Sequence, residues 1–221
     1  MTSFVAWQPP TRSGEQATVA KYMPRRRRPP SPTWRVFLDN HVKQMVAVDF
    51  FTVPTATFRI LFVFVVLAHD RRRLLHFNVT EHPTAAWTGQ QIREAFPWDT
   101  VPRFLLRDRD GVYGDQFVRV VRSLEIEQVL IAARSPWQNP YAERVIGSVR
   151  RECLDHVIIL NEVHLRQLLK QYFNYYHRSR THLSLAKDAP EPRTVEPPDN
   201  GDVVEIPEVG GLHHRYMRRA A

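Results

Sequence analysis

The sequence contains a single cysteine, Cys153, among its 221 residues. One thiol cannot form a disulfide framework within the chain or a multi-cysteine zinc site, so neither can stabilise this fold. Proteins without disulfides are typical of reducing compartments, and we expect a cytoplasmic location. Because 43% of the residues are hydrophobic, the chain can bury a core of ordinary size instead.

Long hydrophobic runs are also missing. The longest apolar run spans residues 60–68, whereas a helix that crosses a membrane needs about 20 residues. The first ten residues contain no basic region followed by an apolar stretch. We therefore expect neither a signal peptide nor a membrane partner.

Acidic residues are too few to balance the basic ones, and 31 Lys and Arg against 23 Asp and Glu give a net charge of +8. The first 35 residues hold seven of the bases and only one acid, and they include the run Arg25, Arg26, Arg27 and Arg28. A basic arm before a mildly basic core suits a polyanionic partner such as nucleic acid. A solvated basic surface would give the same composition.

Apolar patterns predict five strands, over residues 45–51, 58–68, 74–79, 104–106 and 128–132. Short connections join the first three, which indicates an antiparallel meander. Helical patterns over residues 84–96 and 115–124 separate the later strands, as in parallel crossovers. We therefore expect an α/β fold, in which a five-stranded mixed sheet carries helices on both faces.

Two further helices are expected in the second half of the chain. Asn139 and Pro140 favour a helix start, as N-cap and first helical residue, for a helix that runs to about residue 157. Asn161 is expected to cap a second helix that extends through residue 176. Residues 1–35 and 187–221 show no such periodicity, and we expect them to be irregular and extended.

Three acidic residues occupy positions that could hold a metal ion. Asp49 and Asp108 are each expected to end an apolar strand, and Glu143 lies in the first turn of a predicted helix. Carboxylates at strand ends and on a nearby helix can converge above a sheet, where their mutual repulsion requires a cation. Mg²⁺ is the hard ion that suits such ligands.

Each acid also has an ordinary explanation, as a turn or cap residue or as a partner of the helix dipole. Asp110, next to Gly111, is a rival to Asp108 for the metal role. We favour Asp108 because it directly continues the strand predicted over residues 104–106.

The helix that carries Glu143 also places Gly147 and Arg150 on the same side. Glycine costs a helix about 1 kcal/mol relative to alanine, so Gly147 indicates either room for a ligand or a close contact between helices. Arg150 lies two turns beyond Glu143, where it can meet a phosphate or simply face solvent.

Taken in order, these motifs resemble the DDE recombinase superfamily, which comprises retroviral integrases and the transposases of bacterial insertion sequences. The matching segments are residues 48–51, 107–111, 135–144 and 174–185. The interval of 35 residues between Asp108 and Glu143 is typical of that family. The resemblance covers about residues 34–190.

The resemblance implies an RNase H-like fold in which Asp49, Asp108 and Glu143 are the catalytic residues and the metal ligands. It implies two Mg²⁺ ions, for which Mn²⁺ can substitute. It also implies a set of DNA contacts, to which we add Arg144 and the N-terminal arginines: Gln138, Asn139, Arg144, Arg150, Arg25, Arg26, Arg27 and Arg28. The expected partners are double-stranded DNA, both element ends and target, and further copies of the chain. A nucleoid-associated protein of the bacterial cytoplasm would fit this role.

Bacterial members of the family usually carry a helix-turn-helix region before the core, and here only residues 17–23 resemble its last helix. We therefore interpret residues 1–33 as a basic arm that is a remnant of such a region. Residues 34–186 are the expected integrase catalytic core, and residues 187–221 a proline-rich extended tail. The expected function is metal-dependent DNA cleavage and strand transfer by a polynucleotidyl transferase. The alternatives are a truncated, catalytically silent copy that binds DNA or an intact transposase, and an RNase H-like nuclease.

Overall fold

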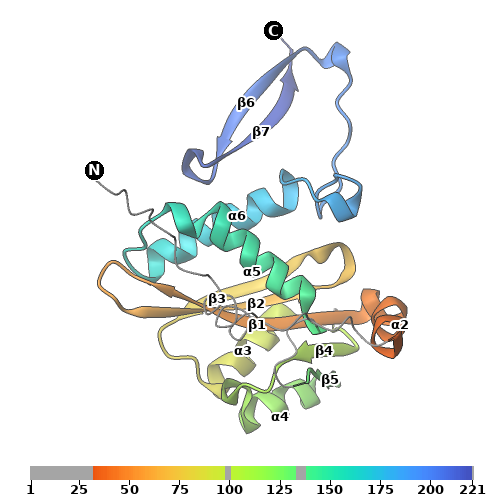
Figure 1. Ribbon diagram of the computed structural model, residues 1–221, viewed down its shortest axis with the longest axis vertical. Coiled ribbons are helices and arrows are strands. Elements are labelled where there is room, and N and C mark those ends of the chain that lie inside the picture. The colour runs from red at the N-terminus through yellow and green to blue at the C-terminus, as the bar shows by residue number, and fades with distance from the viewer. Residues whose placement is uncertain (1–31, 98–100, 133–137, 221) are drawn as a thin grey trace, which may run out of the picture.

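The computed structural model describes residues 32–97, 101–132 and 138–220, and its centre is one mixed sheet (Figure 1). The strand order is β3-β2-β1-β4-β5. The five strands are β1 Met45–Pro54, β2 Ile60–Ala68, β3 Leu74–Thr80, β4 Phe104–Arg107 and β5 Glu127–Leu130. β1, β2 and β3 form the expected antiparallel meander, and β4 runs parallel to both β1 and β5. The predicted fold class is confirmed.

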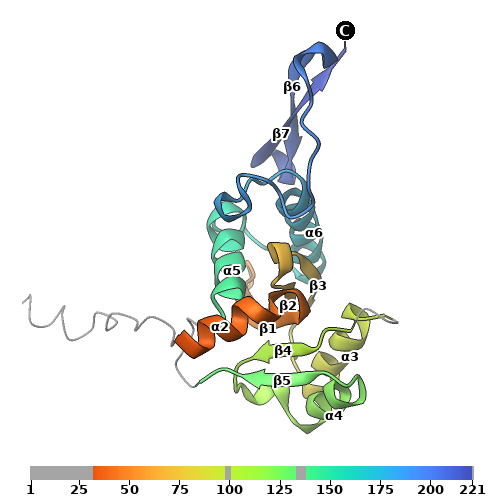
Figure 2. The same cartoon turned by 90° about the vertical axis from the view of Figure 1, so that its right-hand side faces the viewer.

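Helices cover both faces of this sheet (Figures 1 and 2). They are α3 Ala85–Ala95 and α4 Asp115–Ser123 on one face, and α5 Pro140–Glu152 and α6 Glu162–Arg178 on the other. Neighbouring residues of a strand point to opposite faces. Val46 and Val48 therefore enter the core beneath α3 and α4, whereas Ala47 enters the core beneath α5 and α6.

Helix α5 begins at Pro140, as the sequence predicts, but its cap and its end differ from the prediction. Asn139 occupies the N-cap position, but its side chain makes no capping hydrogen bond. The helix ends at Glu152, before the expected residue 157, because the chain must turn to bury Ile159 in the core. The Ile159 carbonyl then accepts a hydrogen bond from the Ala56 amide at 2.6 Å. The predicted cap of α6 is confirmed, since the Asn161 side chain accepts from the His164 amide at 2.9 Å.

The prediction that the first 35 residues are irregular is wrong at its end, because helix α2 spans Pro32–His41. The ring of Phe37 packs edge-on against the ring of Phe104, with their centroids 5.3 Å apart. The centroid of the His41 ring lies 4.8 Å from that of Phe104. An aromatic contact with the start of β4 therefore fixes this helix. The four arginines of residues 25–28 lie outside the described residues.

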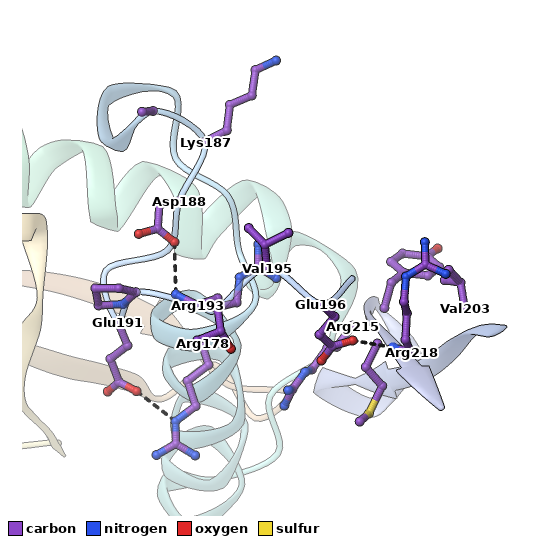
Figure 3. A pocket seen from close by; sticks show the side chains of 15 residues that line it. Arg178, Lys187, Asp188, Glu191, Arg193, Val195, Glu196, Val203, Arg215 and Arg218 are labelled. Atoms are coloured by element: carbon purple, nitrogen blue, oxygen red, sulfur yellow. Dashed lines mark hydrogen bonds and ion pairs between the residues drawn. The ribbon is translucent and has the colours of Figure 1, made fainter. Parts of the chain in front are cut away.

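The predicted extended tail is also wrong in part, because β6 Asp202–Glu208 and β7 His213–Arg219 form an antiparallel hairpin. The hairpin lies beyond α6 (Figure 1). Its turn end docks there through buried Val209 and through His213, whose ring stacks on Tyr175 at 4.3 Å. Figure 3 shows the linking segment, where Glu191 pairs with Arg178 and Glu196 accepts from the Arg218 amide.

Within the described part of the chain, no helix is both long and apolar enough to span a lipid bilayer.

Candidate active site

The register between two parallel strands brings Asp49 and Asp108 to the same level. In the pairing of β1 with β4, Met45 lies opposite Phe104, and Ala47 lies opposite Leu106. Each aspartate lies two residues beyond that last pair. Asp108 directly follows β4, whereas Asp49 lies in the middle of β1, so the prediction that Asp49 ends its strand is wrong. Neighbouring strands are about 4.8 Å apart, so the two residues end side by side. A step of two residues also keeps both on the face of Ala47 and Leu106, which α5 covers.

Glu143 is contributed by the helix that covers this face. It lies in the first turn of α5, which packs on the core through Ala142, Val145 and Val149. The sequence dictates this orientation, because those three apolar residues recur at helical spacing and must face the sheet. Glu143, immediately after Ala142, is thereby held close enough to Asp49 for the two carboxylates to interact.

Electrostatics show that the three carboxylates influence one another. The pKa of Asp49 is raised to about 7, mainly by burial; the hydrogen bond from the Phe50 amide lowers it, and the charges of Asp108 and Glu143 contribute to the rise. That amide donates a hydrogen bond to Asp49 Oδ1 at 2.8 Å. An aspartate that resists ionisation between two other carboxylates is a position where a cation is favourable.

The residues at this position fit a hard divalent cation in chemistry and in charge. All three offer carboxylate oxygens, the ligands that Mg²⁺ and Mn²⁺ take most readily. Among the described ranges, no three His, Cys, Asp or Glu side chains stand close enough together to hold a metal as they are. Asp49, Asp108 and Glu143 would therefore have to draw together around the ion.

Asp110, the rival of Asp108, serves a different local purpose. Its Oδ1 accepts from the Val112 amide at 3.0 Å and caps the 3-10 turn Gly111–Tyr113. Asp108 Oδ1 accepts from the Asp110 amide at 3.1 Å, and Asp108 is the one of the two whose charge raises the pKa of Asp49. The geometry thus favours Asp108 as the partner of Asp49.

The residues expected to contact DNA at the start of α5 are engaged within the protein. Gln138 Oε1 accepts from the Ala132 amide at 2.6 Å, which ties the start of the helix to the end of β5. Asn139 is buried, and its Oδ1 has no hydrogen-bond partner in the part of the chain that is described.

The two expected arginine contacts lie on different sides of α5. Arg150 donates to the Thr52 carbonyl at 3.1 Å, and its guanidinium lies 5.6 Å from the centre of the Phe51 ring. Arg144 is exposed and lines a separate pocket. Arg25, Arg26, Arg27 and Arg28 lie outside the described residues.

Gly147 provides neither the ligand space nor the helix contact expected from the sequence. A Cβ at this position would meet the guanidinium Nη1 of Arg151 at 3.0 Å. The glycine therefore lets the Arg151 side chain fold back over its own helix.

Sequence reasoning missed Arg107, a buried cation beneath the carboxylates. Its Nε donates to Gln128 Oε1 at 2.8 Å, its Nη1 donates to the Asp108 carbonyl at 2.9 Å, and its guanidinium lies 5.3 Å from the Tyr113 ring. Burial lowers the pKa of Arg107, while Tyr113 and Asp108 raise it. Arg107 thus braces the backbone of Asp108 from the opposite face of the sheet. The sequence does contain an indication of this burial: Arg107 lies two residues after buried Leu105 and therefore on the same face of the strand.

Comparison with known proteins agrees with this architecture. Residues 124–190 match the family model of the integrase core domain. The catalytic domain of the Mos1 mariner transposase superposes with a TM-score of 0.54 at 15% identity, over 64% of this chain and 78% of that one. The magnesium-bound catalytic core of HTLV-2 integrase, in its dimeric form, gives 0.53 at 9% identity, over 67% and 93%.

A chain from the simian T-cell lymphotropic virus intasome with the PP2A regulatory subunit B56 gamma gives a TM-score of 0.53 at 13% identity, over 79% and 66% of the two chains. No curated protein matches the sequence significantly. The fold is therefore RNase H-like, as in the catalytic domains of transposases and integrases. Residues 124–190 are in addition similar to the integrase core domain.

Proposed function

We propose that this chain is a DDE transposase or integrase that cleaves DNA and transfers the strand to a new site with the help of divalent metal ions. The observation that supports this proposal is the strand register, which sets Asp49 and Asp108 side by side beneath the helix that carries Glu143. The raised pKa of Asp49 also supports the proposal, because the repulsion between three neighbouring carboxylates destabilises a fold unless a cation offsets it.

In the proposed mechanism, Asp49, Asp108 and Glu143 hold two Mg²⁺ ions, for which Mn²⁺ substitutes. Structures of the Mos1 catalytic domain with Mg and with Mn, and of the HTLV-2 core with magnesium, support this metal use. When bound, the ions supply charge neutralisation at the scissile phosphate and activation of the attacking oxygen. The chain itself orients the carboxylates, and buried Arg107 keeps the Asp108 backbone in place.

The proposed substrate is double-stranded DNA, as element ends and as target. We assign the core to residues 34–186 and a DNA-binding role to the basic arm of residues 1–33. We assign DNA contacts to Gln138, Asn139 and Arg144 at the start of α5 and to Arg150 in its last turn. Joining two ends requires more than one subunit, and the intasome and the dimeric integrase core among the structural neighbours are consistent with a homo-oligomer.

The test is to replace each carboxylate by its neutral isostere: Asp49→Asn, Asp108→Asn and Glu143→Gln. With Mg²⁺ or Mn²⁺ and a DNA substrate, each variant should lose at least about 100-fold in both cleavage and joining, because the metal site is lost. Asp110→Asn is the matched control, and it should retain activity because Asp110 caps a turn.

Wild-type strand transfer by any of the three variants would overturn that residue's assignment. If Asp110→Asn lost activity and Asp108→Asn retained it, the metal-binding role would belong to Asp110 instead of Asp108. Cutting that never yields joined products would identify a nuclease, and a folded wild-type chain without turnover would identify a silent DNA-binding copy.

A further inference from the structure

A second polar site lies on the flank of α5 that faces away from the carboxylates. It is a pocket of about 410 Å³ between α5, the 3-10 turn Asp70–Arg72 and the segment that follows α6. Its polar lining residues include Arg72, Arg144, Ser148, Arg151, Arg180 and His182. Neither Asp49, Asp108 nor Glu143 lines it.

The helix geometry explains why one element serves two sites. Arg144, Ser148 and Arg151 are spaced at i, i+4 and i+7, so they form one stripe along α5. Glu143 lies about 100° around the helix from Arg144, on the side from which its charge acts on Asp49. A group bound in the pocket is therefore close to the carboxylates along the helix axis but separated from them by the helix itself.

The charge of the pocket is positive and only partly compensated. Glu152 accepts from Arg180 at 2.5 and 2.7 Å, and it is the one carboxylate that pairs with a lining arginine. In the described chain, no carboxylate forms an ion pair with Arg72, Arg144 or Arg151. Arg72 instead lies over the Tyr141 ring at 4.9 Å. Three guanidiniums thus remain available to an anion.

The floor of the pocket is fixed before any ligand arrives. Arg180 Nη1 donates to His182 Nδ1 at 3.2 Å, and His182 Nε2 donates to the Tyr176 carbonyl at 3.4 Å. Burial and the neighbouring Arg180 lower the pKa of His182, which agrees with this neutral tautomer. Ser148 Oγ accepts from Arg180 at 3.4 Å, so its own hydroxyl hydrogen is left to donate to a ligand.

We propose that this pocket binds a phosphate group, contributed by a DNA backbone that runs beside the scissile phosphate. Planar guanidiniums and a hydroxyl are the donors that suit phosphate oxygens. The larger pocket beside the hairpin differs, because Asp188, Glu191 and Glu196 offset its basic residues (Figure 3). Naming DNA as the source rests on the proposed function, whereas the phosphate chemistry rests on the pocket alone.

The test uses Arg144→Gln/Arg151→Gln, because both side chains are exposed and do not carry the fold. Binding of a fluorescent DNA duplex is followed by anisotropy in EDTA, so that no cleavage contributes. Affinity should fall about tenfold, and the slope of log K against log salt should fall by about 1, as expected for one lost phosphate contact. Arg119→Gln/Arg122→Gln on α4 removes the same charge elsewhere and should keep the wild-type slope.

Titration with inorganic phosphate by calorimetry separates the two sources of the ligand. Phosphate binding that disappears in the Arg144/Arg151 variant while DNA affinity stays unchanged would overturn the DNA assignment. A variant that matches the α4 control with both ligands would overturn the pocket itself. The titration with inorganic phosphate needs neither metal nor DNA, so a failure of the proposed catalysis stays distinguishable from a failure of the pocket.

Discussion

At the scale of single residues, His69 is the most unusual buried group. It ends the second strand with its ring edge-on to Tyr141 at 4.8 Å, and neither of its nitrogens has a partner within the described residues. Burial lowers the pKa of His69 to about 4. The folded protein therefore keeps this imidazole neutral at pH values where the unfolded chain already protonates it.

His69 should make the protein acid-sensitive. Its folded pKa lies below its ordinary value of 6.5, so its stabilising effect is complete above pH 6.5 and is lost as the pH falls toward 4. The loss at pH 4.5 should be about 2–3 kcal/mol. His69→Phe should remove it, as measured by urea unfolding at pH 7 and 4.5. Exposed His214→Gln is the control, and an equal acid loss in wild type and His69→Phe would contradict the prediction.

Several site residues could be predicted from the sequence and others could not, for physical reasons. Asp49 and Asp108 stood out because each is an acid in or directly after an apolar strand, although β1 continues past Asp49 to Pro54. That the two aspartates lie side by side could not be predicted from the sequence, because the register of two strands depends on how they pair. Arg107 was missed because a cation at the end of a strand normally marks the exit to solvent, whereas here Gln128 and aromatic rings receive it.

At the scale of elements, the fold was predictable where a segment carries its own periodicity. The five strands and the four helices packed on the sheet all have an apolar periodicity of their own. Helix α2 and the β6–β7 hairpin lack one, because both depend on contacts with residues far away in the chain. Phe37 needs Phe104, and His213 needs Tyr175. Local sequence rules cannot detect such tertiary support.

The end of α5 is tied to the chain beyond α6 by Glu152. Burial raises the pKa of Glu152, but hydrogen bonds from Arg180 and Tyr172 lower it more, so the net shift is downward. The Tyr172 hydroxyl donates to Glu152 at 2.8 Å, beside the two bonds from Arg180. This link is stabilising as long as the carboxylate is ionised.

Glu152→Gln should therefore destabilise the fold by about 1–3 kcal/mol at pH 7, because it weakens charged hydrogen bonds. Since the folded pKa is depressed, the difference from wild type should be complete above about pH 4.5 and shrink as the pH falls further. Urea midpoints between pH 3 and 7 measure it. Glu162→Gln breaks only the surface pair with Arg166, and it should cost about 0.5 kcal/mol or less. A pH-independent difference for Glu152→Gln would contradict the prediction.

At the scale of the whole molecule, the hairpin is attached to the core through a small contact. Val209 is 4% exposed in the core cluster, whereas the strands themselves are largely exposed. Val209→Asp should release the hairpin, because a buried unpaired charge is unfavourable. Limited proteolysis between residues 192 and 201 should accelerate, while the helical circular dichroism of the core is kept. Exposed Val203→Asp should leave the cleavage rate unchanged, and an equal rate in both variants would show that the contact does not hold the hairpin.

The chain positions of the carboxylates also have a consequence for biosynthesis. Asp49 and Glu143 are separated by 94 positions in the chain. At about 5–20 residues per second, a ribosome needs roughly 5–20 s to extend the chain from one to the other. During that interval all five strands of the sheet are completed, but the third carboxylate is still missing. Under the proposed function, a prematurely terminated product that stops before α5 is therefore inert toward the nucleic acids that surround it.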